Sequence, residues 1–121
     1  MKLKTDPRHI KRIKLMQTLF SWNFLQKKRI PKEISEIVKN FDEIDKVIGG
    51  SATDRPISEI NKIDLAILRL AVFELIIKKE APVKVVIDEA VELGKEFGSD
   101  SSGSFINGAL GQVIKLKKIK I

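Results

Sequence analysis

Six basic side chains and a single acid, Asp6, occupy the first 14 residues of this 121-residue chain. The bases are Lys2, Lys4, Arg8, Lys11, Arg12 and Lys14. Lysine and arginine at this density bind phosphate backbones by charge, and nearby aromatic rings can stack on unpaired bases. Phe20 and Trp22 follow on the same predicted helix, where ordinary core packing is their alternative role. The run therefore indicates either a binding site for a polyanion or a solvated basic tail.

The charge is concentrated at the two ends of the chain. A second basic segment, residues 115–121, holds Lys115, Lys117, Lys118 and Lys120. The hundred residues between carry 13 bases and 15 acids, so their net charge is close to zero although the chain as a whole carries +7. This distribution favours nucleic acid as the partner, ahead of an anionic membrane surface.

Catalytic and metal-binding chemistry is poorly represented. The absence of cysteine excludes disulfides, thiolate zinc sites and a cysteine nucleophile, and one histidine excludes a multi-histidine metal site. His9 stands in the basic run, where we expect a solvated or phosphate-contacting side chain. The acids of one predicted helix form a solvated face: Asp88, Glu89, Glu92 and Glu96. We predict a protein that is not an enzyme and that needs no cofactor or metal.

The elements that position these residues are predicted to be helices. Asp6-Pro7 is a helix start, because a side-chain acceptor precedes a proline that needs no backbone partner. Apolar residues then recur with the helical period, in a chain that is 43% hydrophobic, which predicts one all-α globular domain over residues 1–121. The predicted helices cover residues 7–25, 32–48 (ended by Gly49-Gly50), 61–79, 83–97 and 103–115, with a short turn at 57–60.

Three of these helices carry further expectations. Residues 65–77 are apolar except for Arg69 and Glu74, and 13 residues are too few for a bilayer span of ~20, so we expect a buried core helix in a cytoplasmic protein. Phe97 is expected to point inward. Gly108 and Gly111 each cost ~1 kcal/mol in a helix relative to alanine, which predicts that a neighbouring helix approaches closely there.

Four segments, in this order, resemble the NusB family of transcription antitermination factors. They are RHIKRIKLMQTLFSWNF at 8–24, NKIDLAILRLAVFEL at 61–75, APVKVVIDEAVELGKEFG at 81–98 and SFINGAL at 104–110. The resemblance implies an all-α fold of six or seven helices in two small packed subdomains. It also implies binding of the single-stranded boxA element of nascent ribosomal RNA, a heterodimer with the ribosomal protein NusE, and assembly with RNA polymerase.

The same resemblance implies roles for individual residues. The RNA-binding positions would be Lys4, Arg8, His9, Lys11, Arg12, Lys14, Phe20, Phe97, Ser101 and Phe105, and Asp64 would face the protein partner. The chain departs from the family pattern at Ile13, Ser101, Ser104 and Gly111, and Phe20 lacks the usual phenol hydroxyl. These departures imply an altered RNA affinity or sequence preference and leave the fold unaffected.

Two other functions are compatible with the sequence. NusB-like domains also guide some ribosomal RNA cytosine methyltransferases, but such an enzyme needs a methyl-donor-binding domain for which 121 residues leave no room. A homo-oligomeric helical scaffold without RNA function is the third reading, and it predicts no salt-dependent RNA binding. Whether the free protein is a monomer or a homodimer stays open at this point.

Overall fold

The computed structural model describes residues 6–25, 29–52 and 55–121, and all regular structure in these ranges is helical. The α-helices are α1 (Pro7–Leu25), α2 (Ser35–Lys39), α3 (Phe41–Ser51), α4 (Lys62–Val72), α5 (Val83–Phe97) and α6 (Ser102–Leu116). Two short 3-10 turns, η1 (Lys32–Ile34) and η2 (Ile57–Glu59), and the π-helical η3 (Phe73–Lys78) complete the set. The all-α prediction is confirmed, and Lys2 and Lys4 lie outside the described residues.

Helix α4 is the centre of the fold. Its residues are buried without interruption from Asp64 to Val72, and it contacts α1, α3, α5 and α6. The helix begins at Asn61, whose side-chain oxygen accepts hydrogen bonds from the backbone N–H groups of Ile63 at 2.9 Å and Asp64 at 3.3 Å. Within the described ranges no helix has the length and apolarity that crossing a bilayer requires. The predicted core helix is thus confirmed.

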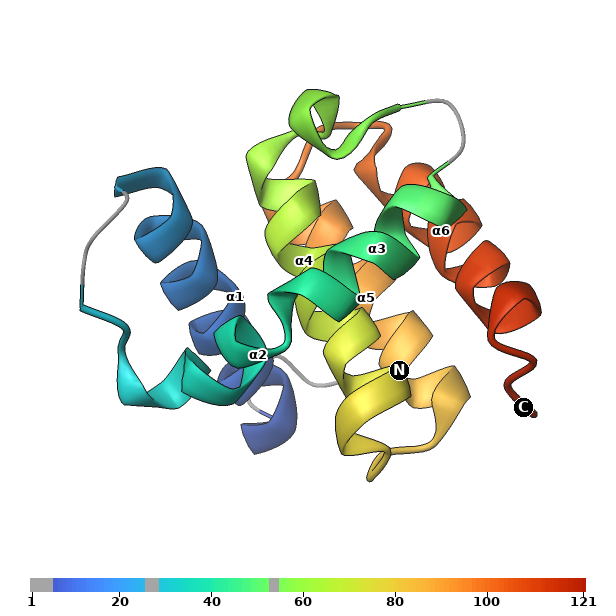
Figure 1. Cartoon of the computed structure of the whole chain (residues 1–121), viewed down its shortest axis with the longest axis horizontal. Coiled ribbons are helices and arrows are strands. Elements are labelled where there is room, and N and C mark those ends of the chain that lie inside the picture. Colours follow the sequence, from blue (N-terminus) through green and yellow to red (C-terminus); the bar gives the residue numbers. More distant parts are fainter. Residues whose placement is uncertain (1–5, 26–28, 53–54) are drawn as a thin grey trace.

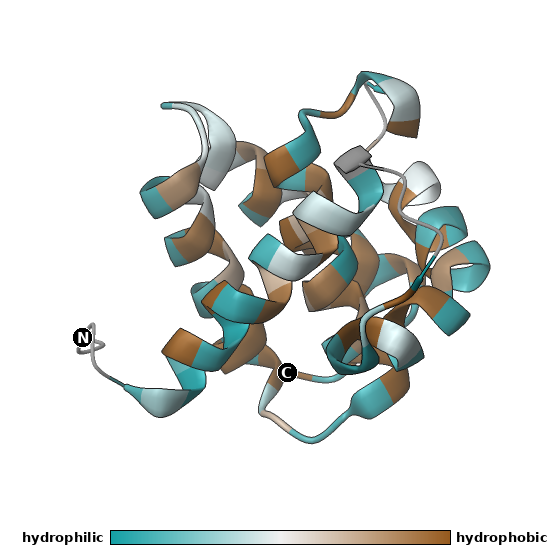
Figure 2. Cartoon of the chain, turned by 90° about the vertical axis from the view of Figure 1, so that its left-hand side faces the viewer, coloured by the Kyte–Doolittle hydropathy of each residue, from teal (hydrophilic) through white to brown (hydrophobic). Residues whose placement is uncertain are grey.

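The helices on either side of α4 share one hydrophobic core. Helices α1 and α2 form the left part of Figure 1, and α5 and α6 lie behind and to the right of α4. Apolar segments turn toward one another between the helices, as the brown segments in Figure 2 show. The core includes side chains from every α-helix, among them Met16, Leu19, Ile37, Ile44, Leu68, Leu93 and Leu110. The described helices thus pack around a single core, and the expected division into two helical subdomains stays a prediction.

The predicted helix over residues 32–48 is interrupted. Asn40 leaves helical geometry, with φ −104° and ψ 13°, and its side-chain N–H donates to the carbonyl oxygen of Glu36 at 2.8 Å. This bond satisfies a carbonyl at the end of α2, so the chain can stop and restart without losing the apolar stripe. The predicted stop at Gly49-Gly50 is wrong. Helix α3 continues through both glycines to Ser51.

The prediction that Gly108 and Gly111 mark a close helix approach is also wrong. A Cβ atom at either position would meet no atom within 4 Å. The close approach is instead at Gly94 of α5, which lies against the start of α6. A Cβ on Gly94 would lie 2.7 Å from Cδ1 of Ile106 and 3.4 Å from the backbone nitrogen of Gly103. Helices α5 and α6 therefore pack through the glycines that the helical spacing did not single out.

We predict opposite effects for two glycine substitutions. Gly108→Ala should raise the free energy of unfolding by about 0.5–1 kcal/mol, because alanine favours the helix and the position is open. Gly98→Ala should lower it by about 1–3 kcal/mol, because the new Cβ would lie 2.8 Å from the carbonyl oxygen of Gly94. Urea unfolding of both variants checks the pair, and equal effects would contradict the packing described here.

Candidate nucleic-acid interface

A capped first turn fixes where the basic residues of α1 stand. Oδ1 of Asp6 accepts a hydrogen bond from the backbone N–H of Arg8 at 2.8 Å. This bond holds the pKa of Asp6 below its usual value. The helix therefore starts at Pro7, as the sequence predicts, and the residues that follow occupy a regular helical surface.

Helix α1 separates its charged residues onto two faces. The side chains of Arg8, Lys11 and Lys14 are exposed, and they follow one another at intervals of three residues. His9 and Arg12 are only 3% and 9% exposed. A polyanion can therefore reach Arg8, Lys11 and Lys14 without any rearrangement of the helix.

The exposed bases border two adjoining hollows, which we name the basic channel. One, of about 420 Å³, lies between α1 and the turn after η3, with Arg8, Lys11 and Lys78 beside apolar groups such as Phe73. The other, of about 750 Å³, follows α1 toward η1 and is lined by Lys11, Lys14, Trp22 and Pro31 among others. Both include Lys11 and Leu15, so the two hollows adjoin at these side chains.

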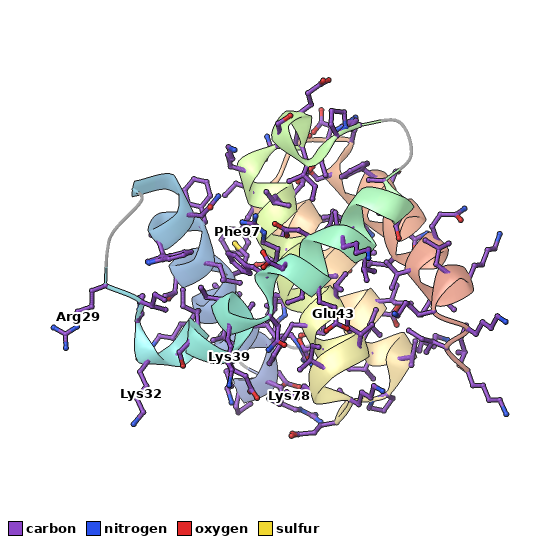
Figure 3. All side chains as sticks on the ribbon, viewed as in Figure 1. Arg29, Lys32, Lys39, Glu43, Lys78 and Phe97 are labelled. Atoms are coloured by element: carbon purple, nitrogen blue, oxygen red, sulfur yellow. The ribbon has the colours of Figure 1, made fainter. Side chains whose placement is uncertain are left out.

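Further bases lie around the channel. Arg29 and Lys32 point away from the ribbon on the α1–α2 side of the molecule, and Lys78 lies at its lower edge (Figure 3). None of these three was a sequence-predicted site residue. Lys78 lies more than 60 residues from the basic run, so only the fold brings it beside Arg8 and Lys11.

Trp22 is the aromatic side chain that lines the larger hollow of the channel. Lys11, Leu15, Thr18 and Trp22 follow the helical spacing and line one hollow together. Phe20 is nine residues from Lys11, which places it about half a turn away around the helix. It is half-buried and packs against the core, so its role in RNA stacking stays a prediction. The spacing of Trp22 from Lys11 was available in the sequence and could have identified it.

Arg12 is part of a buried ion-pair cluster. Its Nε and Nη2 atoms donate to the two carboxylate oxygens of Glu74 at 2.9 and 2.8 Å, and Nη1 donates to Glu89 at 3.3 Å. Hydrogen bonding to Glu74 raises the pKa of Arg12 above its usual value, although burial opposes this effect. The guanidinium already has carboxylate partners, so we assign Arg12 to this cluster rather than to a phosphate contact.

The same cluster corrects two expectations about exposure. His9 is neither solvated nor placed to meet a phosphate: its ring lies 3.1 Å from an oxygen of Glu89 and 2.7 Å from one of Glu96. Glu89, predicted on a solvated face, is 0% exposed. The sequence pattern sorted these residues by polarity alone, whereas mutual neutralisation allows acid and base to be buried together.

The remaining predicted RNA positions cluster near the α5–α6 turn. Phe97 is 36% exposed rather than inward-pointing, because it ends α5. Ser101 is exposed, with its hydroxyl 3.3 Å from that of Ser99. Phe105 is half-buried and lines a separate hollow of about 350 Å³, where the guanidinium of Arg55 lies 4.6 Å from its ring centre. The site residues thus fall into two regions, the basic channel and this turn.

Asp64 lies at the first turn of α4 and is 3% exposed. Its Oδ1 atom is buried and has no hydrogen-bond partner among the described residues. A buried carboxylate oxygen without a partner is costly, and the structure places no donor beside it among the described residues. The partner-facing role of Asp64 remains a prediction.

Comparisons with known proteins agree on one family. The model of the NusB family matches residues 26–115. Proteins with the name transcription antitermination protein NusB are 46% identical over 84 residues in Acetivibrio thermocellus and 42% identical over 90 residues in Alkaliphilus oremlandii. These alignments cover 69% and 74% of this chain, and 58% and 65% of the relatives. The chain thus spans less than two thirds of the length of these relatives.

Solved structures extend the likeness to nearly the whole chain. T. maritima NusB superposes with a TM-score of 0.82 at 28% identity, covering 95% of this chain and 93% of that one. The antitermination factors NusB and NusE in complex with dsRNA include a chain with a TM-score of 0.75 at 22% identity, covering 92% and 99%. The second likeness is one of fold alone. The family match begins after α1, so conclusions about the basic channel rest on its geometry.

We predict that Arg8 and Arg12 differ in their effect on stability. Arg12→Ala should lower the free energy of unfolding by about 3–5 kcal/mol, because it removes the guanidinium that pairs with Glu74 and with the buried Glu89. Arg8→Ala should leave the free energy nearly unchanged, because that side chain is 83% exposed. Thermal and urea unfolding measure both variants. A stable Arg12→Ala protein would contradict the cluster.

Proposed function

Because the chain belongs to the NusB family, we propose that it acts in transcription antitermination by binding the single-stranded boxA element of nascent ribosomal RNA together with NusE. The names of its relatives support the process, and the NusB–NusE complex with dsRNA supports the kind of partners. In this proposal the pair acts on RNA polymerase in the cytoplasm, and the chain contributes binding rather than catalysis.

The basic channel is the observation that carries the proposal. Three exposed bases on a regular helix, Arg8, Lys11 and Lys14, supply positive charge along a line, and Lys78 adds to it from another part of the chain. Phosphates neutralised by such side chains release their counterions, which favours binding of any nucleic acid at moderate salt.

The lining of the channel favours a single strand over a duplex. Trp22 and Phe73 place apolar surface beside the lysine and arginine side chains of the channel. Unpaired bases can lie on apolar and aromatic surface while their phosphates meet the cationic rim, whereas a duplex keeps its bases stacked inside. A single-stranded element is therefore the better fit to this combination of charge and apolar lining.

A second protein is needed for tight binding on this geometry. A few phosphate contacts provide limited affinity at physiological salt, and contacts to a bound partner raise the effective affinity without changing the channel. Asp64 is the residue proposed to meet that partner, as the family resemblance implies. Its buried Oδ1 atom accepts no hydrogen bond from the described residues.

We predict a salt-dependent affinity for a boxA-like single strand. Each phosphate contact contributes a slope of about −0.7 to log affinity against log salt, so Arg8, Lys11 and Lys14 together give about −2. Lys11→Ala should make the slope shallower by about 0.7 and weaken all sequences alike. Fluorescence titrations at several salt concentrations measure both effects.

Lys46→Ala is the matched control, because Lys46 is an exposed lysine on α3 that lines neither hollow of the channel. It should leave the slope unchanged. Equal slopes for Lys11→Ala and the unmodified chain would refute the channel as the RNA surface. Absence of salt-dependent binding altogether would instead favour the scaffold without RNA function.

We predict that Asp64→Asn weakens association with NusE by about tenfold, because the amide keeps the shape and removes the charge that a partner donor would meet. Asparagine is preferable to lysine here, since the side chain is buried. Calorimetric titration with NusE measures association, and thermal unfolding provides the control. A variant that loses only about 0.3–1 kcal/mol of stability and binds NusE normally would assign Asp64 to helix N-terminal charge alone.

A further inference from the structure

His9 has a carboxylate at both of its ring nitrogens. Nδ1 lies 3.1 Å from Oε1 of Glu89, and Nε2 lies 2.7 Å from Oε1 of Glu96. A neutral imidazole carries one N–H, so it can donate to only one of two ionised carboxylates. Both contacts are hydrogen bonds when the ring carries two protons and a positive charge. The geometry thus fits a doubly protonated ring that donates to both carboxylates.

Charged groups from three elements surround this ring. Arg12 lies on the same helix, Glu89 and Glu96 come from α5, and Glu74 of η3 joins the cluster through Arg12. Asp6 precedes the ring on α1 and caps the backbone of Arg8. The cluster contains three carboxylates, those of Glu74, Glu89 and Glu96, and one guanidinium, that of Arg12. A protonated His9 therefore supplies the second positive charge and lowers the excess of negative charge.

The two carboxylates differ in their freedom to move. The side chain of Glu89 is 1% exposed and is also held by Arg12, whereas that of Glu96 is 33% exposed at the last turn of α5. When the ring loses a proton, we expect the contact to Glu96 to break, because that carboxylate can turn into water. His9 would then keep only its contact to Glu89, and the first turn of α1 would lose one of its two links to α5.

We propose that His9 and Glu96 form a proton-dependent link that positions the first turn of α1 for RNA binding. The inference rests on the proposed function, because Arg8 and Lys11 flank His9 and line the basic channel. Losing the proton loosens these two basic side chains and removes one positive charge beneath them. Both effects weaken the contact with phosphates, so His9 and Glu96 are positioning residues for the RNA surface.

The direction of the titration follows from the same contacts. Burial lowers the pKa of His9, but the hydrogen bonds to Glu96 and Glu89 outweigh it, and the pKa is raised above its usual value of 6.5. The folded chain therefore holds the proton more tightly than the unfolded chain does. The stabilisation is fully present below the unfolded pKa, and it is lost as the pH rises through the higher folded pKa.

The link is tested first without RNA. His9 is the only histidine of the chain, so its ring nitrogens give unambiguous NMR signals. We expect both nitrogens to be protonated at about pH 6.5 in the folded chain, with the proton lost at higher pH. Glu96→Gln should shift that titration to lower pH, whereas Glu92→Gln, an exposed acid on the same helix, should not. An unchanged titration in Glu96→Gln would overturn the link.

Titration with a boxA-like single strand tests the positioning role. Affinity should fall by about five- to tenfold between about pH 6 and pH 8.5 in the unmodified chain and in Glu92→Gln, and much less in Glu96→Gln. If the RNA affinity stays constant over the pH range in which His9 loses its proton, the inference is overturned and the proposed function stands. Absence of RNA binding at every pH would overturn the proposed function and the positioning role together, while the NMR result would still decide the link.

Discussion

The buried carboxylate of Glu89 is the constraint on which the rest of this structure depends. A negative charge with 0% exposure needs close cations, and both that contact it, Arg12 and His9, come from α1. Helix α1 must therefore pack with one particular face toward α5 and η3. His9 and Arg12 occupy the inward-facing positions of the first two turns. Arg8 and Lys11, in the same turns, are therefore directed into solvent. Compensation of one buried charge thus sets the orientation of the basic surface.

A second ion pair fixes the opposite side of the core. Arg69 of α4 donates twice to Asp45 of α3, at 2.9 and 2.8 Å, and its guanidinium lies 4.2 Å from the ring centre of Phe41. Phe41 in turn meets Trp22 edge-on, with ring centres 5.9 Å apart. The tryptophan on the basic channel is therefore supported by a chain of contacts that reaches the central helix. The ion pairs of Arg12 and Arg69 thus each join two or more elements, which helps to set the register of the packing.

Helix positions were predictable from the sequence because they depend on local signals. The Asp6-Pro7 start, the 83–97 helix and the buried 61–79 segment all follow from caps and apolar spacing. Two errors are local, the break at Asn40 and the helix that continues through Gly49-Gly50. The others concern relations between distant segments. His9, Arg12 and Glu89 are polar in any pattern, and only the side-chain contacts between α1 and α5 show that they neutralise one another. Likewise, Lys78 joins the basic channel through the fold alone, and Gly94 rather than Gly108 meets a neighbouring helix.

The π-helical stretch from Phe73 to Lys78 has a consequence for how this segment evolves. A π-turn holds one residue more than an α-turn and behaves as an insertion absorbed inside a helix. If one residue were removed here, the stretch could rewind to α-helical geometry through about the same total rotation, so the side chains on either side would keep their faces. Lys78 would then stay beside the channel although the segment was one residue shorter. Length variation in this one turn is thus a change that related chains can absorb without moving their surface charge.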